Sequence, residues 1–205
     1  MVIYSCQDDD SSDTTPPGKL MIDSITPTHG GGIIEYSLPE DDDILFVRAE
    51  YTNTLGVDVY RVSSVHNNTI EIDGLNQTTP LNVRLYVVDE NGNISDFTET
   101  EFTPLVSYIY LVQESIEIAP DLGGVKIEWE NIESKTVYVH LYIRYNGEEE
   151  IRILSSNNET ESLYVRGLES IEMTFLTKVE DFDGNITDLE EKAVLTPLFE
   201  EVIDK

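Results

Sequence analysis

Apolar and polar residues alternate over many short stretches of this chain. In residues 81–87 and 137–143 every second side chain is apolar, which is the period of a β-strand with one buried face. Turn-forming pairs such as Asn-Gly, Asp-Gly and Gly-Gly separate these stretches, and no segment carries the pattern of a long amphipathic helix. The pattern therefore predicts an all-β protein built from short antiparallel strands.

The chain also repeats itself, at an offset of 93 residues or, in one loop, of 92. The matching segments are 30–31 with 123–124, 74–75 with 167–168, 103–105 with 196–198, and 89–96 with 181–188. A repeat of this length with about seven short strands is typical of a β-sandwich. We therefore expect a short disordered tether over residues 1–18, one sandwich over 19–105 and a second over 106–205. Trp129 alternates with Val125 and Ile127, so it is predicted to lie in the core.

Composition excludes several classes of function. The chain of 205 residues has 41 acidic and 12 basic side chains, a formal net charge of −29, and a pI near 4.1, so nucleic acid is not an expected partner. It has three histidines and one cysteine, and it carries no nucleophile, metal-ligand or phosphate-binding motif. The acidic runs Asp41–Asp43 and Glu148–Glu150 are expected in loops, where solvated carboxylates make poor general acids. The chain is not expected to be an enzyme.

The amino-terminal segment has one distinctive residue, Cys6. An apolar run and Ser5 precede it, and Gln7 and Asp8–Asp10 follow it. This order resembles a bacterial lipobox joined to the acidic export signal of outer-surface lipoproteins. The resemblance implies a lipid attached at Cys6, an outer-membrane location on the cell surface, and membrane contact through that anchor alone. The alternative is a disordered acidic tail whose cysteine has no role.

Residues 81–105 resemble the last two strands and the connecting turn of fibronectin type III modules, which are immunoglobulin-like sandwiches. Trp129 lies on the strand where that family keeps its core tryptophan. Together with the motif at Cys6, the Thr-Pro-Pro-Gly segment at residues 15–18 and the repeated Gly-Asn turns, the chain resembles the amino-terminal half of Bacteroidetes surface lipoproteins from polysaccharide-utilisation loci.

The resemblance implies a function and a set of partners. In that family two fibronectin-like modules serve a polysaccharide-uptake system as non-catalytic glycan-binding, spacer or scaffold parts. The expected partners are a polysaccharide or outer-membrane proteins of glycan uptake. The alternative is a protein-interaction module that docks on an outer-membrane partner through an exposed sheet edge or through the face formed by residues 138–144.

The candidate glycan-binding residues lie on one strand of the second repeat. The outward positions of residues 137–145 are Tyr138, His140, Tyr142 and Arg144. Tyrosine rings stack on the apolar face of a sugar, and the polar neighbours hydrogen-bond its hydroxyl groups. The equivalent positions of the first repeat are Phe46, Arg48, Glu50 and Thr52, which are less aromatic. The alternative is that the tyrosines are ordinary cross-strand packing pairs or face the neighbouring module.

The two repeated turns are candidate calcium sites, and no other cofactor is expected. Their oxygen-bearing residues are Asp89, Asn91, Asn93 and Asp96 in the first turn and Asp181, Asp183, Asn185 and Asp188 in the second. Calcium prefers six to eight oxygen ligands, and this spacing partly matches a calcium-binding loop. The alternative is a tight hairpin turn, because Asn-Gly and Asp-Gly supply the positive φ angles that such turns need.

Overall fold

A computed structural model of the chain describes residues 13–199. The described residues form two compact units, one before and one after Pro104, except that the loops 28–31 and 73–79 belong to the second unit. Cys6, the predicted lipid attachment site, lies outside the described residues. Among residues 13–199, no helix has the length and the apolar character needed to cross a membrane.

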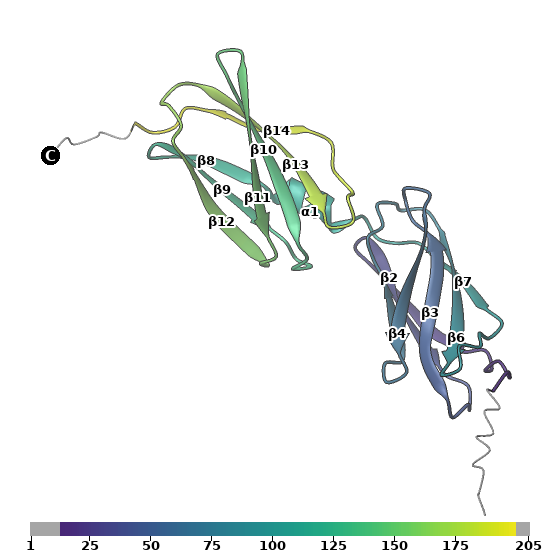
Figure 1. Cartoon of the computed structure of the whole chain (residues 1–205). Coiled ribbons are helices and arrows are strands. Elements are labelled where there is room, and N and C mark those ends of the chain that lie inside the picture. The colour runs from purple at the N-terminus through teal and green to yellow at the C-terminus, as the bar shows by residue number, and fades with distance from the viewer. Residues whose placement is uncertain (1–12, 200–205) are drawn as a thin grey trace, which may run out of the picture. The chain divides into compact units, whose positions relative to one another are not determined.

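The first sandwich pairs a three-stranded sheet with a four-stranded sheet (Figure 1). The smaller sheet has the order β1-β2-β5 and the larger one β4-β3-β6-β7, all antiparallel where the register is defined. The strands are β1 (Met21–Thr28), β2 (Gly31–Ser37), β3 (Ile44–Thr52), β4 (Asp58–Ser64), β5 (Thr69–Ile72), β6 (Leu81–Asp89) and β7 (Thr98–Phe102).

The second sandwich repeats this arrangement and adds one helix. Its sheets have the orders β8-β9-β12 and β11-β10-β13-β14. Its elements are α1 (Tyr108–Ser115), β8 (Glu117–Asp121), β9 (Gly124–Glu130), β10 (Val137–Tyr145), β11 (Glu148–Ser156), β12 (Thr160–Arg166), β13 (Met173–Asp181) and β14 (Glu190–Leu195). Both sandwiches have the strand order of fibronectin type III and immunoglobulin-like modules, so the predicted fold class is confirmed.

Alternation along the strands explains why the two sheets of each sandwich stay together. The alternating apolar residues of β6 and β10 are nearly all inaccessible to solvent, and their neighbours point outward. Trp129 is only 2% exposed and belongs to the core of the second sandwich, as its spacing predicts. Each such aliphatic side chain contributes about 2 kcal/mol when it is fully buried.

Helix α1 is the main element that the sequence pattern did not predict. Its residues Ile109 and Val112 are 0% and 1% exposed, and Ile116 just after it is also buried. These residues contact the core, and α1 packs against β9 and β13. Only eight residues long, the helix depends on this packing, because isolated helices of that length are unstable in water.

The acidic runs are placed differently from each other. Asp42 and Asp43 lie in a turn, as expected for the first run. The second run was expected in a loop, but Glu148–Glu150 form the beginning of β11. Opposite them β10 supplies Tyr145, Arg144 and Ile143, so pairing with β10 determines the conformation.

The repeated sequence motifs lie together in space and share hydrogen bonds. In the second sandwich the Gly123 N–H donates to the Leu198 carbonyl (2.9 Å) and the Leu168 N–H donates to the Gly123 carbonyl (3.1 Å). The first copy has the same two bonds at Gly30, with lengths of 3.2 and 3.0 Å. Gly30 and Gly123 have φ angles of 75° and 62°, a region that favours glycine. The motif is therefore a structural joint between three segments.

Gly124 is the position where a substitution should disturb the second sandwich most. A β-carbon there would overlap the backbone carbonyl of Val165 on the neighbouring strand. We expect Gly124→Ala to lower the free energy of unfolding by about 3 kcal/mol, because a backbone atom cannot move aside cheaply. The measurement is urea unfolding followed by the fluorescence of Trp129, the single tryptophan.

Gly167→Ala is the matched control for this prediction. Gly167 has a φ of 80° but open space around its α-carbon, so the change should cost about 1 kcal/mol of backbone strain alone. Equal losses in the two variants would contradict the account of the Gly124 contact.

Candidate functional site

The four predicted glycan-binding residues project from the same side of β10. Tyr138, His140 and Tyr142 are half-buried and Arg144 is exposed, whereas the residues between them, Val139, Leu141 and Ile143, are fully buried. The structure therefore brings all four to the outer face of the larger sheet, away from the core. Whether they bind a glycan stays a prediction.

Two of these four side chains form ion pairs or hydrogen bonds with the adjacent strands. The His140 Nε2 lies 2.7 Å from Glu180 Oε2 on β13. The Arg144 Nε donates to Glu149 Oε2 on β11 over 2.6 Å. Both groups already have a carboxylate partner, so a ligand would have to share or displace these contacts.

Tyr142 lies beside both a cation and aliphatic side chains. Its ring lies 5.4 Å from the Nζ of Lys178, a distance at which a cation is attracted to an aromatic face. On the edge strand β11, Ile151 faces Tyr142 and Ile153 faces His140. These two isoleucines are 51% and 61% exposed. This face of the second sandwich therefore combines the half-buried rings of Tyr138 and Tyr142 with exposed aliphatic groups.

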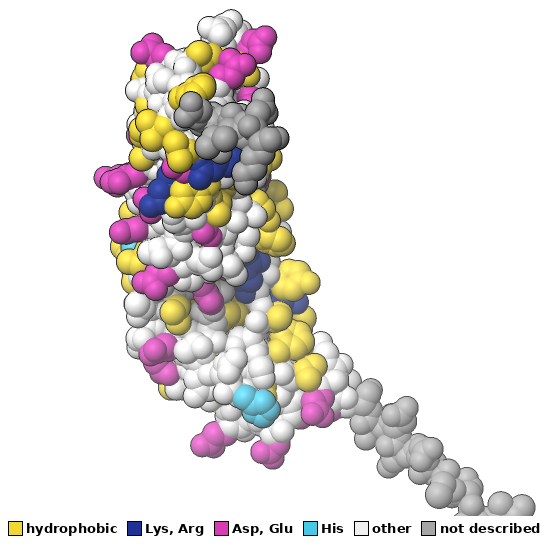
Figure 2. Space-filling view, turned by 90° about the vertical axis from the view of Figure 1, so that its left-hand side faces the viewer, with side chains coloured by type: hydrophobic (Ala, Val, Ile, Leu, Met, Phe, Trp, Pro, Cys, Tyr) yellow, Lys and Arg dark blue, Asp and Glu magenta, His cyan; other side chains and the backbone are white. Residues whose placement is uncertain are grey.

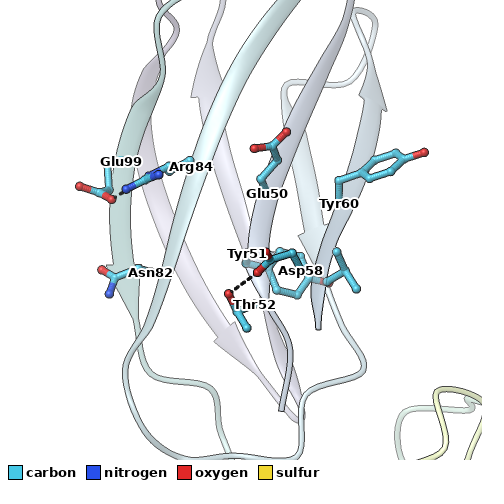
Figure 3. Close-up of a pocket in the computed structure, with 9 residues that line it drawn as sticks. Glu50, Tyr51, Thr52, Asp58, Tyr60, Asn82, Arg84 and Glu99 are labelled. Carbon is cyan, nitrogen blue, oxygen red and sulfur yellow. Dashed lines mark hydrogen bonds and ion pairs between the residues drawn. The ribbon is translucent and has the colours of Figure 1, made fainter. Parts of the chain in front are cut away.

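The same face of the first sandwich carries a row of four side chains of a different kind. The strand register places Tyr60 opposite Glu50, Glu50 opposite Arg84, and Arg84 opposite Glu99. The row therefore crosses all four strands of the larger sheet, with an aromatic side chain at one edge. Figure 3 shows Tyr60, Glu50, Arg84 and Glu99 on their strands, with Arg84 directed toward Glu99.

A neighbouring row completes an open groove on this face. Thr52 lies opposite Asp58, and its hydroxyl donates to Asp58 Oδ1 over 2.7 Å. Asn82 lies on β6, two residues before Arg84. The two rows line a hollow of about 690 Å³, which we call the first-sandwich groove. The lining residues are Glu50, Tyr51, Thr52, Asp58, Val59, Tyr60, Asn82, Arg84 and Glu99.

The charged groups of the first-sandwich groove are held by specific partners. Glu50 Oε1 lies 3.0 Å from Arg48 Nε. Arg84 Nε donates to Glu99 Oε1 over 3.1 Å, and its guanidinium lies 4.8 Å from the ring centroid of Phe97. Planar guanidinium groups that pair and stack in this way are restricted in orientation. The groove therefore presents positioned donors and acceptors beside the exposed ring of Tyr60.

Inspection of single strands could not identify this groove. Its four principal residues are spread over four strands between positions 50 and 99, and only the register places them in one row. The signal that could have found it is the position of Tyr60 on β4, which alternation places on the outward face of the sheet together with Glu50.

In the first repeated turn, Asp89 is a hub of hydrogen bonds. Its Oδ1 accepts the backbone N–H groups of Asn91 (3.0 Å) and Asn93 (2.8 Å), and its Oδ2 accepts the Asn93 side-chain amide (2.8 Å). Burial would by itself raise the pKa of Asp89, but the hydrogen bonds from Asn93, Asn91 and Gly92 outweigh it, so the pKa lies below its ordinary value.

The second turn repeats this arrangement. Asn185 donates its backbone N–H to Asp181 Oδ1 and its side-chain amide to Asp181 Oδ2, each over 2.8 Å. The hydroxyls of Ser95 and Thr187 accept the backbone N–H groups of Val87 and Val179 at 2.9 Å. The repeated sequence therefore encodes the same hydrogen-bonded turn twice.

The remaining residues of the calcium prediction are at the surface. Asn91, Asp96, Asp183 and Asp188 are exposed, and Asp96 Oδ2 lies 3.7 Å from the Nζ of Lys19. Carboxylates of Asp13 and Asp43 come within 4.8 Å of Asp89, a set that the sequence did not single out. Within each turn the structure groups only the Asp and Asn that hold the loop, and calcium binding stays a prediction.

Comparisons with known proteins give two family models and several solved structures. The models are described as "Domain of unknown function (DUF4959)", over residues 17–104, and "Domain of unknown function (DUF5126)", over residues 105–205. The chain matches no curated protein.

Three solved structures illustrate the likeness to other proteins. SusE-like protein BT2857 is 25% identical with a TM-score of 0.36, and the match covers 47% of this chain and 34% of that one. The chain thus spans about a third of that protein's length. A two-module fibronectin type III segment of chicken tenascin is 13% identical (TM-score 0.38, 89% and 99% covered). The first three fibronectin modules of chicken CNTN1 are 12% identical (0.35, 89% and 66%).

The lowered pKa of Asp89 makes the stability of the first sandwich depend on pH. A carboxyl group with a lower pKa in the folded state stabilises it above the unfolded pKa, and this contribution is lost as the pH falls through the folded pKa. We expect Asp89→Asn to be less stable than the wild type at neutral pH, with the difference shrinking on acidification. Urea unfolding followed by circular dichroism over a series of pH values measures this.

Asp96→Asn is the control, because Asp96 lies at the exposed end of the same turn. This variant should leave the pH dependence of the free energy of unfolding close to that of the wild type. An unchanged pH dependence in Asp89→Asn would show that the carboxylate does not hold the turn as described.

Proposed function

We propose that this chain is a non-catalytic component of a polysaccharide-uptake system on the bacterial cell surface, where it binds glycan or spaces other glycan-binding parts. The motif around Cys6 supports a lipid anchor in the outer membrane, and that residue lies outside the described part of the structure. An anchor at Cys6 would hold both sandwiches at the outer surface of that membrane.

The observation that carries this proposal is that both larger sheets leave an outer face open to solvent with tyrosines on it. Tyr60 is 65% exposed on the first sandwich, and Tyr138 and Tyr142 are half-buried on the second. Strands hold such rings at fixed spacing. A tyrosine ring beside charged and amide groups matches a sugar, which has both apolar C–H faces and hydroxyl groups.

The state of the carboxylates on these faces supports binding without catalysis. A general acid for glycoside hydrolysis needs a desolvated carboxyl group with a raised pKa. The side chains of Glu50 and Glu99 are 41% and 48% exposed, and each is paired with an arginine. Neither carboxyl group is desolvated and each lies beside an arginine, so these groups are suited to accept hydrogen bonds from a ligand.

The distribution of charge supports a surface location. The formal net charge is −29, and Figure 2 shows acidic side chains spread over the visible face among only a few lysines and arginines. Repulsion of this size keeps a protein solvated and apart from other acidic molecules.

A second candidate function is docking on a partner protein through the second sandwich. The exposed Ile151 and Ile153 beside Tyr142 favour it, because exposed aliphatic groups on a sheet face are suited to protein contacts more than to sugars. In this case the partner would be an outer-membrane protein of the uptake system.

Native affinity electrophoresis of the full chain carrying Cys6→Ser tests the glycan-binding function. Gels would contain galactomannan, xyloglucan or amylopectin, and serum albumin would serve as the non-binding reference. We expect at least one polysaccharide to slow the chain relative to albumin. Unchanged mobility on all three would contradict glycan binding and favour the spacer or docking function.

A further inference from the structure

We propose that the first-sandwich groove is a binding site for a neutral saccharide chain. This inference rests on the function proposed above and narrows it to one surface and one class of glycan. The residues that would contact the ligand are Tyr60, Glu50, Asn82, Arg84 and Glu99.

The order of side chains across the groove suits a sugar. At one edge the ring of Tyr60 is 65% exposed, so most of an aromatic surface remains available for contact with C–H groups. Next to it stand an acceptor, Glu50, and a donor, Arg84, opposite each other in the register. Sugar hydroxyls both donate and accept hydrogen bonds, so alternating acceptors and donors can satisfy several hydroxyls in succession.

The dimensions fit an oligosaccharide better than a single sugar. Neighbouring strands lie about 4.8 Å apart, so the row from Tyr60 to Glu99, which crosses four strands, spans about 14 Å. The groove is open along this row, and its volume is about 690 Å³. A linear chain could therefore lie across the strands and extend beyond both edges.

Charge argues for a neutral ligand. The groove contains three carboxylates, those of Glu50, Asp58 and Glu99, against the single guanidinium of Arg84 among its lining residues. An anionic glycan would be repelled by these groups and by the whole chain.

A cation is disfavoured for a different reason. Glu50 is paired with Arg48, Glu99 with Arg84, and Asp58 accepts the Thr52 hydroxyl. A cation would have to break these contacts, whereas a sugar hydroxyl can add to them, because each carboxylate oxygen accepts more than one hydrogen bond.

The second sandwich shows that the groove does not follow from the fold alone. The register places Ile151, Tyr142, Leu176 and Glu191 in the corresponding row of its larger sheet. Aliphatic residues there replace the tyrosine and the arginine of the first sandwich. The two copies therefore share a backbone arrangement, while only the first combines an exposed ring with paired charges at these positions.

The test is native affinity electrophoresis of the full chain, with Cys6→Ser throughout, on galactomannan, xyloglucan, amylopectin and the anionic polygalacturonate. The variants are Tyr60→Ala, Glu50→Gln and the control Tyr164→Ala, which removes a tyrosine of similar exposure (57%, against 65% for Tyr60) from β12. On the neutral polysaccharide that slows the parent chain, we expect Tyr60→Ala to raise the dissociation constant about tenfold. Glu50→Gln should weaken binding less, and Tyr164→Ala should leave it unchanged.

Other outcomes separate this inference from the function on which it rests. Binding that survives Tyr60→Ala and Glu50→Gln but is lost in Tyr142→Ala would overturn the groove and leave glycan binding in place. Retardation by polygalacturonate alone would contradict the inference that the ligand is a neutral saccharide. A parent chain that no polysaccharide slows would overturn both. Circular dichroism checks that Tyr60→Ala is folded. If Tyr60→Ala unfolds, Glu50→Gln, which keeps the shape of the side chain, provides the test instead.

Discussion

Everything in this structure depends on the packing of two sheets against each other through one face each. Alternation along β3, β6, β10 and β13 places nearly every second side chain in a core, and those core positions are apolar in both copies with few exceptions. The remaining side chains point outward and take no part in that packing. Stability therefore constrains half of each strand and leaves the other half free to carry function.

The two copies use this freedom differently. In the cores and in the turns they remain alike, even in hydrogen bonds, as the pairs Asp89–Asn93 and Asp181–Asn185 show. On the outer faces they have diverged, with a polar row around Arg84 in the first and an aliphatic row around Leu176 in the second. A duplicated module whose copies keep their framework but not their outer faces is consistent with a division of tasks between them.

Much of the fold could be predicted from the sequence, because period-two alternation and turn residues are local signals. The burial of Trp129 and the outward direction of Tyr138 and Tyr142 follow from the same alternation. Helix α1 was missed because its apolar spacing extends over only eight residues, too few to distinguish it from a linker. The expectation of a loop at Glu148–Glu150 was also wrong, because pairing with β10 outweighs the preference of acidic runs for loops.

The candidate site was less predictable for a physical reason. The first-sandwich groove depends on which residues of four strands lie opposite each other, and register is a property of the whole sheet rather than of any segment. Glu50 and Tyr60 are ten positions apart, and Glu50 and Glu99 are 49 apart. No local pattern connects them.

We infer that the outer face of the first sandwich, rather than that of the second, engages a neutral glycan. The most direct measurement is a nuclear magnetic resonance titration of the isotope-labelled chain with soluble neutral oligosaccharides prepared from galactomannan, xyloglucan and amylopectin. We expect at least one of them to shift backbone amide signals mainly at Glu50, Tyr60 and Arg84. Shifts confined to β10 and β11, or no shifts with any of the three, would contradict it.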